Sequence, residues 1–217
     1  MLASLFVDAF RFIPDNAHLL LQKTLELAEL AFTALGIAIL IALPLGLWLG
    51  HRHRGLFVAL GVSSLGRALP SIALIGFFIA WLGVGFWNLT IALVVIGLPP
   101  VLTNTFFAVE GVDADVVEAA RGMGLTERQI LTRVELPLGL PLIIAGIRIA
   151  AVFVIATSTL AGIVGGGGLG DIIANQSTYG LAGVLAAALC VSAVALLATW
   201  LLGLGERAAA RKMAPST

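Results

Sequence analysis

The feature that most constrains this sequence is the length of its segments without charged side chains. Residues 68–109 contain no Asp, Glu, Lys or Arg, and neither do residues 30–50. A helix that crosses the hydrocarbon core of a bilayer needs about 20 mostly apolar residues. Overall, 60% of the residues are apolar and 11% are charged, whereas soluble domains carry about 25% charged residues. The chain is therefore predicted to be an all-α membrane protein.

The gaps between charged residues predict about five transmembrane helices. Glycines and aromatic residues at 83–88 divide the longest apolar stretch into two spans, since both favour a turn at the membrane surface. A glycine-rich turn at 165–170 ends a later span. Arg67 and Pro70 are expected to mark a bend near the start of the second span. The predicted spans are 25–50, 66–83, 88–109, 138–164 and 181–203.

The two ends of the chain are predicted to lie outside the membrane-spanning domain. In residues 1–23, Asp8, Arg11, Pro14 and Asp15 interrupt the apolar residues too early for a span. The basic start and small-residue cleavage site of a signal peptide are not evident in this segment. We expect a segment at the membrane interface, with a sixth crossing as the alternative. The transmembrane domain is placed at 24–207 and a cytoplasmic tail at 208–217.

Lysine and arginine predict how the spans are oriented, because these residues accumulate in short cytoplasmic loops. With five spans, the loop at 51–55, the segment 110–137 and the tail share one side. That side holds eight basic residues, whereas Arg11 and Lys23 lie on the other. The N-terminus is therefore predicted outside and the C-terminus in the cytoplasm. The eight are Arg52, Arg54, Arg121, Arg128, Arg133, Arg207, Arg211 and Lys212.

Several kinds of site are disfavoured by the sequence. The 12 basic residues balance 12 acidic ones, so no basic excess points to nucleic acid. The lone Cys190 gives neither a disulfide nor a cysteine-based metal site, and His51 and His53 are interpreted as part of a charged loop. No paired carboxylates or nucleophile with a base share one membrane depth, so no catalytic residue and no metal ligand is assigned. Because the phosphate-binding G-x-x-x-x-G-K-[ST] motif is missing, ATP is not expected to bind here.

Residues 110–137 form the one sizeable polar segment, with nine charged residues in 28 positions. Asp113 or Asp115 can cap a short helix that Gly122 or Gly124 ends. Thr126, followed three residues later by Gln129, predicts the capping box of a second short helix. The pair Leu136-Pro137 then returns the chain to the membrane. Two short helices joined at glycines would make a compact knob that fits a groove in another protein.

The spacing within this segment resembles the EAA motif of ABC importer permeases. It reads Glu118-Ala119-Ala120, three residues, Gly124, nine residues, Val134, one residue, and then Leu136-Pro137. The resemblance implies the type I importer permease fold, with this loop docking on an ATP-binding subunit. Ala119 and Ala120 would allow close approach, Glu118 would offer a charge, and Gly124 would permit the turn.

The resemblance covers about residues 24–207 and is strongest to the permeases of osmoprotectant uptake systems for glycine betaine, carnitine and choline. RALPSIALIGFFI at 67–79, VELPLGLPLIIAGIRIA at 134–150 and GIVGGGGLGDII at 162–173 carry it. Methionine importer permeases share the fold, the length and a similar GGLG turn, and remain the alternative ligand class. A secondary transporter or channel is the alternative from another class, although the later spans lack the intramembrane acids that such proteins use for ion coupling.

The same resemblance implies the partners and the compartment. We expect two ATP-binding subunits that hold ATP and Mg²⁺, a second permease subunit, an extracytoplasmic substrate-binding protein and the lipid of a bacterial inner membrane. Residues of a gate or pathway are less sharply defined. Arg148 inside a span either has such a role or pairs with a neighbouring helix. The candidates are Arg67, Pro70, Arg148, Gly167, Gly168 and Gly170.

Overall fold

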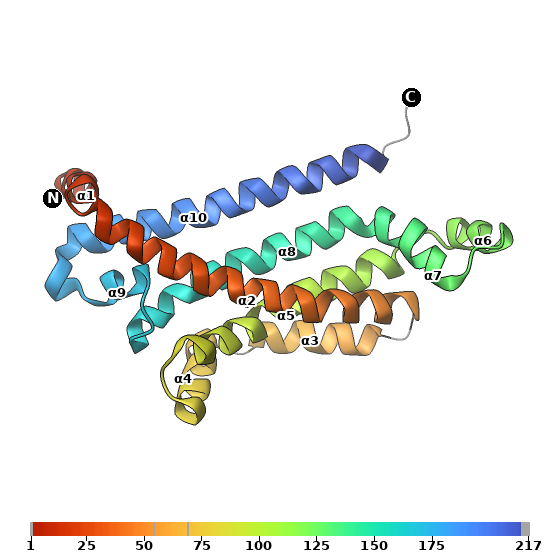
Figure 1. Ribbon diagram of the computed structural model, residues 1–217, viewed down its shortest axis with the longest axis horizontal. Helices are drawn as coiled ribbons and strands as arrows, with labels where there is room; N and C mark the ends of the chain where they lie inside the picture. The colour runs from red at the N-terminus through yellow and green to blue at the C-terminus, as the bar shows by residue number, and fades with distance from the viewer. Residues whose placement is uncertain (1, 54, 69, 214–217) are drawn as a thin grey trace. The chain divides into compact units, whose positions relative to one another are not determined.

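The computed structural model describes residues 2–53, 55–68 and 70–213, which are nearly all helical, with no β-strand in these ranges. The predicted all-α class is confirmed. Figure 1 shows the course of the helices. In chain order they are α1 (Leu2–Asp15), α2 (Ala17–His51), α3 (Leu56–Ala68), α4 (Ser71–Leu82), α5 (Phe86–Glu110), α6 (Ala114–Gly122), α7 (Glu127–Ile130), the π-helical turn η1 (Leu131–Glu135), α8 (Leu136–Ser158), the 3₁₀ helix η2 (Thr159–Val164), α9 (Leu169–Ala174) and α10 (Gln176–Met213).

Four helical stretches within the described residues are long and apolar enough to cross a membrane. They are Ala17–His51, Phe86–Glu110, Glu127–Val164 and Gln176–Arg211. Prolines lie inside three of them, at Pro44, at Pro99 and Pro100, and at Pro141. Four of the five predicted spans therefore have a matching helix. The start predicted for the last span, residue 181, also agrees with the structure, because Gly180 leaves the helical conformation at φ 66°.

The second predicted span, 66–83, is not one helix. The chain is helical to Ala68 in α3 and again from Ser71 in α4, and Pro70 at the start of α4 has extended backbone angles of φ −63° and ψ 123°. Proline removes a backbone donor and disfavours helix in the residue before it. With 12 residues, α4 alone is shorter than a membrane span needs. The expected bend at Pro70 is thus a complete interruption.

The fold divides into two compact units. The first is built from the described residues of Met1–Gly36, Leu69–Ile96 and Ala151–Ala198, and the second from those of Ile37–Ala68, Gly97–Ala150 and Thr199–Thr217. The long helices α2, α5, α8 and α10 contribute residues to both units. Segments far apart in the sequence therefore pack together within each unit.

In the second unit, glycines let α2 and α8 approach the backbone of α5. Gly46 and Gly50 on α2 form a G-x-x-x-G pair, and a Cβ on Gly50 would lie 2.8 Å from the Phe106 carbonyl oxygen. On α8, a Cβ on Gly139 would lie 2.7 Å from the Ala108 carbonyl oxygen. Small residues at such positions permit the close helix packing that holds membrane helices together. Helix α5 is therefore the central helix of this unit.

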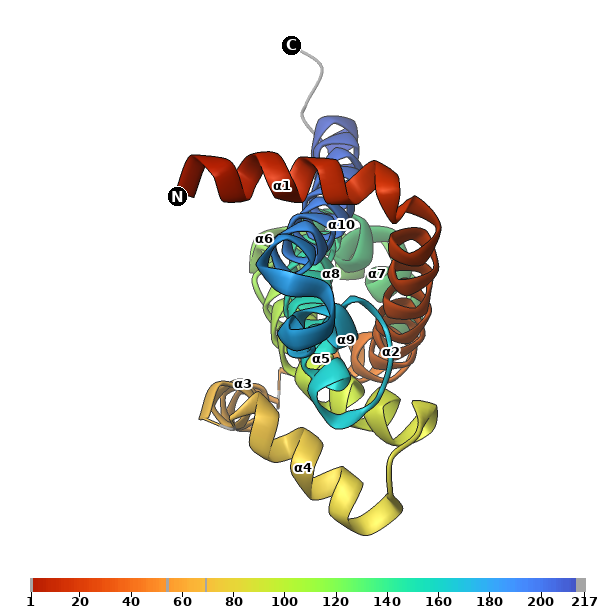
Figure 2. The ribbon, with the colours of Figure 1, turned by 90° about the vertical axis from the view of Figure 1, so that its left-hand side faces the viewer.

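In the first unit, α1 meets α2 at a turn. The backbone N–H of Asn16 donates to the Phe12 carbonyl, and α1 runs across the start of α2 (Figure 2). Phe12 packs toward Gly183 of α10, while Phe6 and Phe10 are exposed. An amphipathic helix of this kind fits the interfacial segment predicted for residues 1–23, which remains a prediction.

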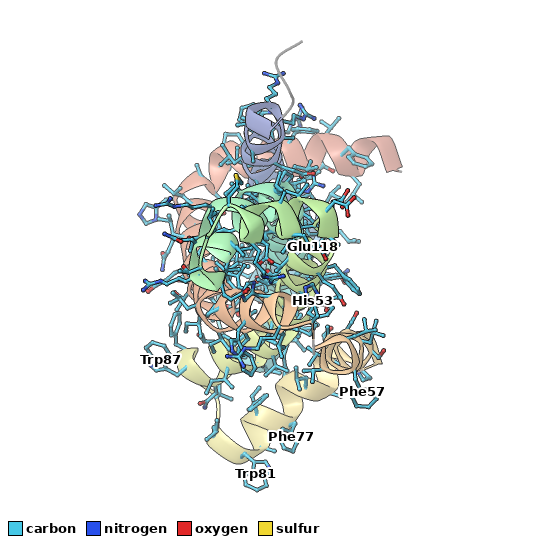
Figure 3. All side chains as sticks on the ribbon, turned by 90° about the vertical axis from the view of Figure 1, so that its right-hand side faces the viewer. His53, Phe57, Phe77, Trp81, Trp87 and Glu118 are labelled. Carbon is cyan, nitrogen blue, oxygen red and sulfur yellow. The ribbon has the colours of Figure 1, made fainter. Side chains whose placement is uncertain are left out.

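Large apolar side chains cover much of the outer surface. Phe77 and Trp81 project from one side of α4, with 56% and 78% of their surface exposed (Figure 3). Trp48, Trp87 and Trp200 are also more than half exposed. Such a surface is unfavourable in water but suits lipid, where apolar side chains face the acyl chains. The protein is a multi-pass membrane protein.

Replacing Gly50 by alanine tests the close approach of α2 to α5. The added Cβ meets a backbone oxygen, which cannot move aside as a side chain can, so we expect a loss of about 1–3 kcal/mol of stability. Gly61→Ala in α3 of the same unit is the matched control, because nothing lies within 4 Å of its added Cβ. Thermal unfolding in detergent, followed by size-exclusion chromatography, measures both. Equal melting temperatures for the two variants would contradict this packing.

Candidate functional site

The polar segment 110–137 contains two helical elements side by side in the second unit (Figure 1). Helix α6 begins at Ala114, and the side chain of Asp113 accepts a hydrogen bond of 2.9 Å from the backbone N–H of Asp115. A carboxylate at this position accepts a hydrogen bond from a free backbone N–H and is attracted to the positive end of the helix dipole. The predicted cap is confirmed, with Asp113 rather than Asp115 in that role.

Gly124 ends α6. Its φ is +83°, and its N–H donates to the Arg121 carbonyl while the Leu125 N–H donates to the Ala120 carbonyl. These two bonds form the Schellman motif, in which a left-handed residue satisfies the last carbonyls of a helix. Of the two glycines that the sequence offered, Gly122 is still helical, so Gly124 makes the turn.

Thr126 starts the second element with the predicted capping box. Its side chain accepts from the backbone N–H of Gln129, and the Gln129 side chain accepts from the backbone N–H of Thr126 at 2.8 Å. The expected second short helix is not separate, however. The chain stays helical from Glu127 through α7, η1 and α8 to Ser158. Leu136 and Pro137 therefore begin α8 instead of closing a loop.

The residues of the Glu-Ala-Ala triplet point in different directions. Glu118 is exposed on α6 (Figure 3). Ala119 is also exposed, whereas Ala120 is only 2% exposed. Val116 and Met123 add apolar surface beside them, at 43% and 74% exposure. A partner can thus reach Glu118 and Ala119, while Ala120 packs inside this chain. The exposed Met123 was not singled out from the sequence, because one methionine between two glycines carries no periodic signal.

An ion pair joins α6 to α7. Arg121 donates from Nε to Glu127 Oε1 at 3.1 Å and from a terminal nitrogen to Oε2 at 3.3 Å. Both side chains are more than half exposed, so the pair adds at most about 1 kcal/mol to stability. Its two hydrogen bonds connect the end of α6 to the start of α7.

The glycine-rich turn lies in the first unit. Gly165, Gly167 and Gly168 all have positive φ. Gly162 and Gly170 pack backbone to backbone, because a Cβ on Gly162 would overlap the carbonyl carbon of Gly170. The turn is therefore shaped by residues that lack a side chain, and Gly170 serves close packing in this structure.

Charged side chains of α2 hold this turn. Glu26 accepts a hydrogen bond of 2.9 Å from the Gly168 N–H, and Lys23 lies 2.7 Å from Asp171 and 3.0 Å from Glu26. Lys23 and Asp171 are largely buried, at 17% and 24% side-chain exposure. No local pattern predicted this cluster, because Lys23 and Asp171 lie 148 residues apart in the sequence. An acid and a base at the end of a predicted span were the available signal.

Arg148 is paired within the second unit. Its guanidinium lies 3.2 Å from a carboxylate oxygen of Glu206 on α10, and the two side chains are 36% and 28% exposed. Pairing lowers the cost of a charge in a membrane helix, which favours the structural interpretation of Arg148 over the pathway one. Arg67 lies in α3, but its side chain is outside the described part of the chain, as is Arg54.

The chain is similar in sequence to a family of transport proteins and to individual permeases. The family described as "Binding-protein-dependent transport system inner membrane component" matches residues 42–211. A carnitine transport permease protein of Listeria monocytogenes is 39% identical over 193 residues, covering 88% of each chain. A choline transport system permease protein of Bacillus subtilis is 35% identical over 198 residues, covering 91% of each chain.

The fold is similar to that of a solved transporter. An inward-facing structure of the MetNI methionine ABC transporter aligns with a TM-score of 0.77, covering 89% of this chain and 97% of that chain. The sequence identity is 22%, so this likeness concerns the fold. It agrees with the predicted type I importer permease fold.

Replacing Gly124 by alanine tests the turn that ends α6. A left-handed conformation costs an L-residue about 1–2 kcal/mol, so we expect the end of α6 to fray. Gly122→Ala is the matched control, because both glycines are exposed and neither added Cβ meets an atom within 4 Å. We expect Gly122→Ala to leave the helix intact, since alanine favours helix. Amide hydrogen exchange over 118–125 measures the difference, and equal protection in both variants would contradict the assignment.

Proposed function

Because the chain belongs to the family of binding-protein-dependent transport system inner membrane components, we propose that it serves an importer of small quaternary-ammonium osmoprotectants such as carnitine, choline or glycine betaine. It is the permease subunit of an ABC importer in the inner membrane, not its enzyme. The observation that carries the ligand class is the identity of 35–39% with carnitine and choline permeases over about nine tenths of the chain.

The proposed complex has four further components besides this chain. Two ATP-binding subunits hold ATP and Mg²⁺ and hydrolyse ATP, a second permease subunit completes the pathway, and an extracytoplasmic protein delivers the solute. This chain binds no cofactor of its own in the proposal. Its family membership supports such partners, while their number is part of the proposal.

The docking knob, defined as residues 113–130, is the proposed contact with the ATP-binding subunit. It lies in the second unit and presents Glu118, Ala119 and Met123 at its surface. Gly124 sets its shape, and η1 joins it to Leu136 and Pro137 at the start of α8. Closure of the ATP-binding subunits would shift the knob and with it α8. Such a shift requires that nucleotide favours one of two states of the complex.

The glycine-rich turn is proposed to form part of the gate on the outer side of the membrane. The Gly168 N–H bonds to Glu26 and Asp171 pairs with Lys23, both on α2, so a movement of α2 would release this turn. In the same unit, Gly170 allows close packing and Pro70 interrupts the helix. Arg148 is assigned to the support of α10 through Glu206 instead of to the pathway.

Uptake by the reconstituted complex tests the ligand class. With the wild-type chain, its ATP-binding subunits and its binding protein in proteoliposomes, we expect ATP-dependent uptake of labelled carnitine, choline or glycine betaine. Labelled methionine is the comparison ligand, because a methionine importer shares the fold. Uptake of methionine without any of the three osmoprotectants would overturn the proposed ligand class while leaving the permease family unchanged.

Replacing Glu118 by glutamine tests the docking knob. We expect solute uptake to fall about tenfold, as for a central charge in an interface, while the affinity for the binding protein stays unchanged. Asp115→Asn is the matched control, since Asp115 is an exposed acid on the same helix. Both variants lose one negative charge from α6. Normal uptake by Glu118→Gln, or an equal loss in both variants, would contradict the assigned contact.

A further inference from the structure

We propose that a chain of four polar side chains, Arg121, Glu127, His51 and Glu135, links the docking knob to the end of α2. This inference rests on the proposed docking role of the knob. All four residues belong to the second unit and come from α6, α7, α2 and η1. We call them the polar relay.

The inner end of the relay is a buried carboxylate. Glu135 is 1% exposed, and its Oε2 lies 2.6 Å from Nδ1 of His51, the last residue of α2. A buried carboxylate without a partner costs several kcal/mol. Glu135 therefore constrains the position of His51 tightly, and the end of α2 cannot move away from η1 without exposing or unpairing this group.

The π-helical turn explains why an acid lies inside the protein here. Ile130 and Glu135 are five residues apart and are 0% and 1% exposed. Five residues of α-helix would point these side chains far apart, whereas a π turn brings them closer to one face. Pro137 contributes, since its ring would crowd the carbonyl of residue 133 within that turn. Single π turns often occur at functional sites.

The outer end of the relay is exposed. His51 Nε2 lies 3.5 Å from Glu127 Oε2, and Glu127 in turn accepts both hydrogen bonds of Arg121. The His51 ring therefore has a carboxylate beside each of its two nitrogens. The relay thus runs from a side chain that is 55% exposed to one that is 1% exposed.

The relay gives the docking knob a second route into the membrane domain. One route is covalent, since α7 and η1 continue into α8. The other is the relay, which ends on α2. Both α2 and the helix from Glu127 are long enough to span the membrane. A movement of the knob would therefore shift two spanning helices together, and without the relay it would shift α8 alone.

The test compares solute molecules transported per ATP hydrolysed in the reconstituted complex. For Glu127→Gln and for His51→Ala we expect this ratio to fall about fivefold, the size of effect found for residues in coupling networks. The ATP-binding subunits should still co-purify, and the KM for ATP should stay unchanged. Arg128→Ala is the matched control, because Arg128 is the exposed neighbour of Glu127 on α7.

Further variants separate coupling from folding. Glu127 is 60% exposed, so Glu127→Gln should fold normally. This variant therefore still tests the relay if His51→Ala fails to fold. Glu135→Gln keeps an acceptor for His51 and should retain the wild-type ratio within about twofold, whereas Glu135→Leu should not. The double variant His51→Ala/Glu127→Gln should lose no more than His51→Ala alone, because residues of one network are not additive.

The outcomes distinguish this inference from the proposed function. Lack of any ATP-dependent osmoprotectant uptake by the wild-type complex would overturn the proposed function and the relay with it. Normal wild-type uptake together with an unaltered ratio in Glu127→Gln, or additive losses in the double variant, would overturn the relay alone. A reduced ratio in both single variants, no further loss in the double variant and a retained ratio in Glu135→Gln would support it.

Discussion

The absence of water in the hydrocarbon core is the constraint on which the rest of this structure depends. Backbone N–H and C=O groups have no solvent partner there, so each must be satisfied within a helix. This explains why α2, α5 and α8 stay helical through prolines. It also explains the role of glycine in the second unit, because Gly46, Gly50 and Gly139 bring helices together where apolar side chains gain nothing by leaving lipid.

The polar segment 110–137 departs from this pattern, and hydrogen bonds at the ends of its helices give it its shape. Asp113 begins α6, Gly124 ends it and Thr126 begins the next element, and each satisfies backbone groups that a helix leaves free. The docking knob has little buried apolar surface of its own. Hydrogen bonds at these three helix ends nevertheless define where its helices begin and end. A segment built in this way can be rigid enough to transmit a movement although most of its side chains face solvent.

Local chemistry was predictable from the sequence, and long-range pairing was not. The all-α class, the caps at Asp113 and Thr126 and four of the spans follow from composition, hydrogen-bonding side chains and apolar length, all of which act over a few residues. The prediction of one span at 66–83 was wrong. The stretch is apolar and long enough for a span, and Pro70 is the one residue that indicates two helices in place of one. His51 was interpreted as part of a charged loop, since nothing local shows that Glu135, 84 residues later, pairs with it. The inward direction of Ala120 likewise depends on packing that a motif does not contain.

The π turn η1 also sets the phase between the knob and the membrane helix. An α-helix advances by about 100° per residue, and a π turn holds one residue more than the α-helical turn it replaces. Removing one residue between Leu131 and Glu135 would let this stretch become regular α-helix and would rotate everything before it by about 100° about the axis of α8. Glu118 would then face another side of the protein while every residue of the EAA pattern was still present. The number of residues between Gly124 and Leu136 therefore specifies an angle as well as a distance.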